Sequence, residues 1–241
     1  MTAADLETAI DELRINYPQM TISADENETV IAEGDYCLDA EYDGVRLVET
    51  FVIRVAIPPD YPKSVSSVKE ISNIISSDYE HLYEDRSFCL GIDGELRMGI
   101  LDNPSMVAFL EGPVRSYLYS ALFYRRYGRY PFGDRAHGSF GIMQFYMEML
   151  DVDNASQALD IIRFIEIGNY RGHLPCPCGS GVKLRNCHGE QLFEIINGEK
   201  RGVILKDWDK VKKHAYIEEQ YRNHPASVLR ALSLKSPSRR S

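Results

Sequence analysis

Residues 57–62 read Ile57-Pro58-Pro59-Asp60-Tyr61-Pro62, and this stretch decides how the first half of the chain is organised. Proline cannot donate to the hydrogen-bond ladder of a central strand, so an extended segment ends where such prolines begin. Before the stretch, alternating and β-branched residues predict strands over 30–32, 36–42 and 48–57. Asp43-Gly44 separates two of these strands, as a two-residue hairpin turn does. The sequence therefore predicts an antiparallel meander that ends at Ile57.

Helical patterns precede and follow the meander. Apolar residues at mainly helical spacing predict a first helix from 3 to 17, which ends before Pro18. A short strand is expected around 65–71. The segment 74–99 has no sustained period, so it is expected to be a long loop of the kind that carries function. Further helices are predicted at 104–127, 140–150 and 155–167. The order of helix, meander, loop and helices predicts an α+β fold.

The composition is that of an ordinary soluble globular chain: of 241 residues, 44% are hydrophobic and 26% are charged. No stretch approaches the roughly 20 apolar residues of a membrane span, and the N-terminus has no basic region followed by an apolar run. We therefore expect a cytoplasmic protein without a membrane partner. The net charge of −9 is a poor match for a phosphate backbone, so no nucleic-acid partner is expected either.

The five cysteines indicate metal binding or catalysis rather than disulfides, because their number is odd and three of them are clustered. Free cysteines are often buried in a core, and Cys37, in an alternating strand, is expected to be one of these. Cys89 lies in the long loop, within Ser87-Phe88-Cys89-Leu90, and His81 stands eight positions before it. A thiolate at this position would be a strong nucleophile, and its thioester would stay reactive towards amines.

The proline–tyrosine frame, His81 and Cys89 together resemble the ubiquitin-conjugating (E2) family over about residues 3–127. In that family a proline turn follows the meander, and a His-Pro-Asn motif stands eight residues before the active cysteine. The resemblance implies a UBC/E2-like fold in residues 1–150, with an N-terminal helix, an antiparallel meander, a catalytic loop and C-terminal helices. It also implies that Cys89 carries an acyl group as a thioester.

The chain departs from the family just before the cysteine. His81-Leu82-Tyr83 stands in place of His-Pro-Asn, so Tyr83 takes the position of the asparagine that helps to stabilise the oxyanion. A phenol hydroxyl can donate there, but its reach and direction differ from those of an amide. His81 is expected to bond the loop backbone rather than to act as a base. E2 proteins often have an acidic loop after the cysteine, and Asp134 or His137 could occupy that position. The alternative is an internal ion pair between Asp134 and Arg135.

A second set of site residues lies further along the chain. Cys176-Pro177-Cys178 is followed after eight residues by Cys187-His188, and three thiolates with one imidazole suit tetrahedral zinc. Glycines between them allow tight turns, and a metal would supply most of the folding energy of so short a segment. The segment 173–189 resembles the SEC-C motif, which implies a structural or binding role. Four protein ligands leave no open coordination site for catalysis.

These assignments predict four parts: an E2-like domain (1–150), a helical connector (151–172), the zinc segment (173–189) and a helical extension with a loose tail (190–241). An E2-like domain with a SEC-C-like segment resembles the stand-alone E2 proteins of bacterial antiphage (CBASS) operons. That resemblance implies a transferase that takes up the C-terminus of a cGAS-like nucleotidyltransferase on Cys89, passes it to a lysine and so regulates antiphage signalling. No adenylation motif is visible, so the source of the thioester stays open. A non-catalytic binding module and a thiol hydrolase are the alternatives.

Overall fold

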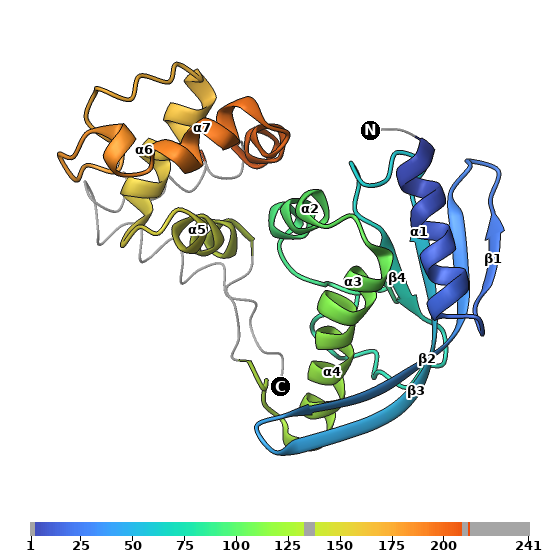
Figure 1. The fold of residues 1–241 in the computed structure, drawn as a ribbon. Helices are drawn as coiled ribbons and strands as arrows, with labels where there is room; N and C mark the ends of the chain where they lie inside the picture. The colour runs from blue at the N-terminus through green and yellow to red at the C-terminus, as the bar shows by residue number, and fades with distance from the viewer. Residues whose placement is uncertain (1–2, 133–137, 209–211, 213–241) are drawn as a thin grey trace. The chain divides into compact units, whose positions relative to one another are not determined.

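Two compact units make up the chain in the computed structural model, which describes residues 3–132, 138–208 and 212 (Figure 1). The first unit is Met1–Asp134 and the second is Arg135–Ser241. The first contains an antiparallel sheet with helices, and the second contains helices and a short cysteine-rich loop. The predicted combination of an antiparallel sheet with helices is thereby confirmed, whereas the division into four parts stays a prediction.

Four strands of the first unit form one antiparallel sheet in the order β1-β2-β3-β4. They are β1 (Thr21–Ala24), β2 (Val30–Tyr42), β3 (Val45–Ile57) and β4 (Ser67–Glu70). The predicted meander is confirmed, since Tyr42 pairs with Val45 and leaves Asp43 and Gly44 as a two-residue turn. Both turn residues have positive φ, 49° and 74°, which suits the twist of a two-residue hairpin. The two strands predicted within 30–42 are one strand, β2, and β1 was not predicted.

Side chains alternate between a buried and an open face along β2 and β3. Tyr36 and Leu38 are buried in the core, and Phe51 and Ile53 of β3 are buried with them. Cys37 lies between the two buried residues of β2, so it points to the other face, where it is exposed. The prediction that Cys37 is a core cysteine is therefore wrong, because the larger apolar neighbours take the buried positions.

The proline-rich stretch ends β3 at Ile57 as predicted, but the meander continues beyond it, because β4 pairs with β3. Tyr61 follows in a turn and is buried, and its hydroxyl donates to the Pro104 carbonyl over 2.8 Å. This bond joins the turn after β3 to the segment just before α3.

The helices of the first unit pack on the sheet and on one another (Figure 1). Helix α1 (Ala3–Asn16) confirms the first predicted helix. The predicted helix at 104–127 is also confirmed, but it consists of α3 (Met106–Phe109), a π-helical turn at Leu110–Val114 and α4 (Arg115–Tyr127). The π-helical turn contains Pro113, which has no N–H to give to the regular ladder.

The long loop expected at 74–99 is partly wrong, because its end belongs to helix α2 (Asp93–Asp102). This helix has two glycines and no side-chain cap, so its local signal is weak. It buries Met98 and Ile100, and tertiary packing therefore stabilises what the local sequence does not. The loop proper ends shortly after Cys89.

The second unit contains α5 (Gly138–Met149), α6 (Ala155–Ile167), α7 (Gly189–Asn197) and a further helical segment at 200–208. The predicted helix at 155–167 is confirmed, with Asn154 as its N-cap and Gly168 in the left-handed conformation at its end. Among the residues that the structure describes, no helix combines the length and apolar character that a membrane crossing requires.

We expect the carboxylate of Glu12 to stabilise the first unit, because one of its oxygens accepts bonds from three groups at the start of α3. These are the Ser105 hydroxyl (2.9 Å), Met106 N–H (2.7 Å) and Val107 N–H (3.3 Å). Glu12→Ala should lower the free energy of unfolding by about 2 kcal/mol in a urea titration. Glu7→Ala, an exposed position on the same helix, should change it by less than about 0.5 kcal/mol. Equal effects of the two substitutions would contradict this role.

Candidate active site and metal centre

A small hairpin at residues 81–89 contains the residues predicted for the active site. The Cys89 N–H donates to the His81 carbonyl over 2.8 Å, and Leu82 pairs with Phe88 in an antiparallel bridge. This register sets His81 directly opposite Cys89. The spacing of eight residues between them is thus that of a cross-strand pair, whose side chains lie on one face.

The turn of this hairpin brings Tyr83 to the same face. Tyr83 N–H donates to the Ser87 carbonyl over 2.9 Å, and Arg86 N–H donates to the Tyr83 carbonyl over 2.8 Å. Tyr83 lies two residues from His81, so its side chain is diagonal to Cys89, within reach of an aromatic residue. Tyr83 is 57% exposed, which leaves this side of the thiol open to solvent.

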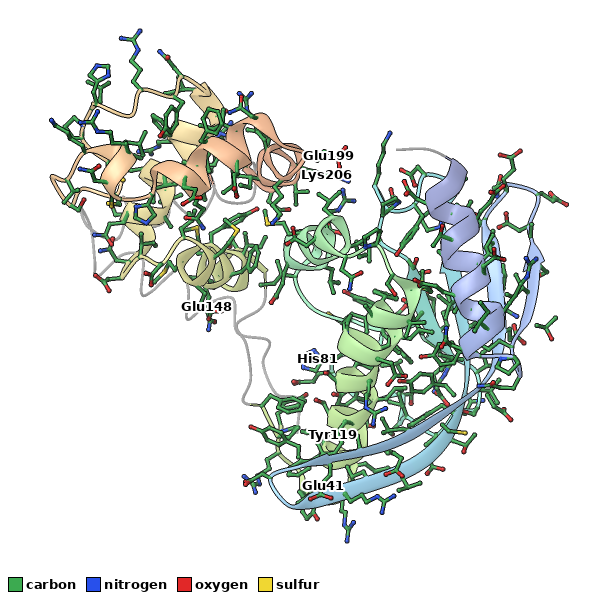
Figure 2. All side chains as sticks on the ribbon, in the orientation of Figure 1. Glu41, His81, Tyr119, Glu148, Glu199 and Lys206 are labelled. Atoms are coloured by element: carbon green, nitrogen blue, oxygen red, sulfur yellow. The ribbon has the colours of Figure 1, made fainter. Side chains whose placement is uncertain are left out.

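Helix α4 anchors both strands of the hairpin through Tyr117. The Tyr117 ring stacks on buried Phe88, with 4.2 Å between the centroids and 18° between the planes. Its hydroxyl donates to the His81 carbonyl over 3.0 Å. Figure 2 shows His81 beside this helix. One side chain therefore fixes the apolar face of the hairpin and the backbone of the strand opposite Cys89.

The pKa of the Cys89 thiol lies below that of an ordinary cysteine. The main cause is a hydrogen bond from the His81 side chain to the sulfur, which opposes the burial that raises the pKa. Bonds from the Tyr83 hydroxyl and the Gly91 N–H lower the pKa further. Gly91 has a φ of 138°, which L side chains rarely adopt, so a glycine suits this turn. A thiolate favoured in this way is the nucleophilic form of cysteine.

Aromatic rings surround the His81 imidazole. Tyr79 and Tyr130 meet it edge to face, with centroid distances of 5.6 and 5.2 Å. Burial raises the pKa of Tyr79, so its hydroxyl stays protonated beside the pair. The sequence indicated a bond from His81 to the loop backbone, and it did not anticipate a bond from the imidazole to the sulfur.

Two further positions considered from the sequence, Asp134 and His137, lie outside the described residues. Tyr117, Gly91 and the Glu70–Arg86 ion pair were missed altogether. Gly91 alone had a recognisable signal, as a glycine just after the candidate nucleophile.

The metal ligands predicted in the second unit come together as one cluster. The ligand atoms of Cys176, Cys178, Cys187 and His188 lie within 4.8 Å of one another. His188 Nδ1 is 3.2 Å from the sulfurs of Cys176 and Cys187, and the sulfurs of Cys178 and Cys187 are 3.6 Å apart. Bonds of about 2.0–2.3 Å to a tetrahedral ion separate its ligand atoms by about 3.3–3.8 Å. The cluster could therefore hold a metal ion.

The other nitrogen of His188 fixes how the ring is oriented. Nε2 lies 2.8 Å from the Leu150 carbonyl, to which only an N–H can donate. In a neutral ring this leaves the Nδ1 lone pair for the ion, which is how metal-ligating histidines are usually held. Burial raises the pKa of the Cys176 thiol, and a cation bound at the cluster would favour its thiolate. Both features fit a metal site.

The backbone around the cluster turns tightly. Cys176 N–H donates to the Val182 carbonyl over 2.7 Å, and Gly179 and Gly181 between them have φ values of 81° and 74°. At Gly189 a Cβ atom would lie 2.7 Å from the Leu184 carbonyl oxygen. The glycines thus allow two cysteines from one turn to approach the Cys-His pair that precedes α7.

The comparison with protein families agrees with this geometry. Residues 174–190 match the SEC-C motif, so the predicted resemblance of this segment is confirmed. No curated protein and no solved structure matches the chain significantly. The match covers only the cluster and its immediate surroundings, and the E2-like assignment of the first unit stays a prediction.

We expect alkylation of Cys89 by iodoacetamide to depend on pH with a midpoint below the value of about 8.5 for a free thiol. A lowered pKa means that thiolate is present above this midpoint and that reactivity disappears as the pH falls through it. His81→Ala removes the main donor, so the midpoint should rise by about one unit and the rate at neutral pH should fall about tenfold. Tyr83→Phe should raise the midpoint by less than His81→Ala does. Mass spectrometry of the Cys89 peptide measures both quantities.

The matched control is Tyr127→Phe, which removes an exposed phenol of the same unit away from the hairpin. It should leave the midpoint unchanged. The thiol contacts described above would be wrong if His81→Ala also kept the midpoint of the unaltered protein.

Proposed function

We propose that the protein is an E2-like transferase that carries an acyl group as a thioester on Cys89. The observation that carries this proposal is the hydrogen bonding of the Cys89 sulfur by His81 and Tyr83 across one hairpin face. Such donors favour the thiolate, and the exposed side at Tyr83 leaves room for a polypeptide end. The order of N-terminal helix, antiparallel sheet, loop and helices supports a UBC/E2-like fold for the first unit.

The reaction has two steps. The Cys89 thiolate attacks the carbonyl carbon of an activated C-terminal acyl group; the C–S bond forms, and the leaving group departs with its electron pair. A lysine amine then attacks the thioester, the C–S bond breaks, and the amine proton passes to solvent. The His81 side chain, which donates to the sulfur, stabilises the thiolate that leaves. Once the sulfur is acylated, it carries no negative charge to stabilise. The Tyr83 hydroxyl then donates to the oxyanion that develops on the carbonyl oxygen.

The partner follows from the resemblance to stand-alone E2 proteins of CBASS operons. The carried group is the C-terminus of a cGAS-like nucleotidyltransferase, and its transfer to a lysine regulates antiphage signalling. The activated acyl donor comes from an adenylating enzyme in trans or from processing of the partner's tail. These steps follow from the family resemblance, whereas the thiol chemistry is proposed from the residues described above.

We expect a covalent adduct between the protein and its nucleotidyltransferase partner when both are mixed with the neighbouring gene products. Intact mass should show the sum of the two chains minus one water, and hydroxylamine should release it, because thioesters react readily with such nucleophiles. Cys89→Ala should abolish the adduct and Cys37→Ser should retain it. A hydroxylamine-sensitive adduct that survives Cys89→Ala would refute the assignment of the carrier.

A thiol hydrolase is the second candidate, and the bond between His81 and the sulfur favours it. A cysteine paired with a histidine is the arrangement that thiol hydrolases use, because the imidazole can activate water against the acyl-enzyme. Water and a lysine amine compete for the same thioester. The product decides between them: a free carboxylate on the partner indicates hydrolysis, and an isopeptide with a lysine indicates transfer.

We propose that the ion held by the SEC-C segment is zinc. Three sulfurs and one imidazole nitrogen in a compact cluster suit its tetrahedral preference. When bound, the ion supplies a cross-link between the turn at Cys176 and Cys178 and the start of α7. The bond from His188 to Leu150 extends this cross-link to the segment between α5 and α6. The role is structural, because four protein ligands fill the coordination shell.

We expect elemental analysis of the purified protein to give about one zinc per chain. Cys178→Ser and His188→Ala should reduce this content to near zero, and a chelator should lower the melting temperature, because binding energy contributes to folding. Cys37→Ser is the control and should keep one ion. A full zinc content in both ligand variants would rule out the cluster as the binding site.

A further inference from the structure

Arg86 occupies an unusual backbone position in the turn of the 81–89 hairpin. Its φ is 64°, in the left-handed region that glycine and asparagine normally fill after such a turn. This backbone conformation costs free energy for an arginine, so contacts of the side chain add to the backbone bonds that hold the residue there. The side chain points back to the end of β4, where it meets Glu70.

Glu70 is a fully buried carboxylate, with a side-chain exposure of 0%. One of its oxygens accepts from the Ser72 hydroxyl over 2.6 Å and from the Ile74 N–H over 2.7 Å, and the other accepts from Arg86. The Val52 N–H in β3 donates to the Ser72 hydroxyl over 3.1 Å. The carboxylate therefore links the sheet to the segment that leads into the hairpin.

The Arg86 guanidinium completes this network from the other side. It donates to the Glu70 carbonyl over 3.1 Å and to the Ile75 carbonyl over 3.0 Å, besides the carboxylate. The backbone carbonyl of Arg86 accepts from the Glu70 N–H over 3.3 Å. One side chain thus ties the hairpin turn to β4 and to the chain that precedes His81.

We propose that Glu70 and Arg86 are positioning residues, which hold the hairpin in the register that sets His81 opposite Cys89. A slip of one residue would turn the sulfur to the other face and away from its donors. A buried ion pair adds little net stability compared with an apolar pair of the same size, so fixing a geometry is the better account of this one. The inference rests on the proposed role of Cys89 as a nucleophile, and neither residue touches the substrate.

The test measures iodoacetamide reactivity of the Cys89 peptide against pH, together with the melting temperature. The decisive variant is Glu70→Gln/Arg86→Met, which removes the ion pair while the amide oxygen at position 70 can still accept from the Ser72 hydroxyl and the Ile74 N–H. We expect it to stay folded while the Cys89 midpoint rises by about one unit and the neutral-pH rate falls about tenfold. Arg86→Lys should show a smaller shift, because it keeps the charge but loses the planar fork.

The matched control is Glu28→Gly, which also removes a charged residue with left-handed φ from a turn of the same unit. It should leave the midpoint unchanged. A folded double variant that keeps the rate and midpoint of the unaltered protein would overturn the positioning role. If the double variant does not fold, a folded Arg86→Lys variant with an unchanged rate and midpoint would overturn the positioning role instead. A Cys89 that reacts as a free thiol in the unaltered protein would instead refute the proposed function.

Discussion

The pairing of His81 with Cys89 across the small hairpin is the constraint on which the candidate active site depends. Side chains alternate along a strand, so the register alone decides whether the sulfur faces an imidazole or the aromatic core. The bond from the Cys89 N–H to the His81 carbonyl fixes that register at one end, and the turn at Arg86 fixes it at the other. Tyr117 then anchors the hairpin to α4 by stacking on one strand and bonding the other. The pKa of the thiol is a consequence of this backbone arrangement.

Much of the fold could be predicted from the sequence where the deciding signal is local. Alternation identified β3 and, as two separate pieces, β2; Asp43-Gly44 identified their turn, and the capped helix at 155–167 was predicted with its observed bounds. Helix α2 was missed, since two glycines and a missing cap hide a helix that forms because it buries Met98. Strand β1 was missed for a related reason, since only its pairing with β2 makes it a strand.

The two candidate sites differ in how much the sequence could predict. All four candidate metal ligands fall within one short segment, so their residue types and spacing are enough to predict the cluster. The carbonyl of Leu150, which orients His188, is 38 residues away and has no side-chain signal in the sequence. The spacing from His81 to Cys89 was recognised only through a family resemblance, and its meaning as a cross-strand pair needs the turn between them. Glu70 and Arg86 look like ordinary surface charges in the sequence, because only the fold buries the carboxylate.

The cysteines of the two sites have the same chemistry and opposite surroundings. The sulfurs of the candidate metal site converge on one point, where thiolates repel one another unless a cation lies between them. An ion bound there would occupy their lone pairs and make them unreactive. The Cys89 sulfur instead accepts one hydrogen bond from each of several donors, and each donor can turn to another acceptor. These hydrogen bonds stabilise the negative charge of the thiolate and leave the sulfur able to attack a carbonyl carbon. Under the proposed function, reactivity belongs to the first unit and rigidity to the second, because Cys89 combines hydrogen-bond donors to its sulfur with an open side.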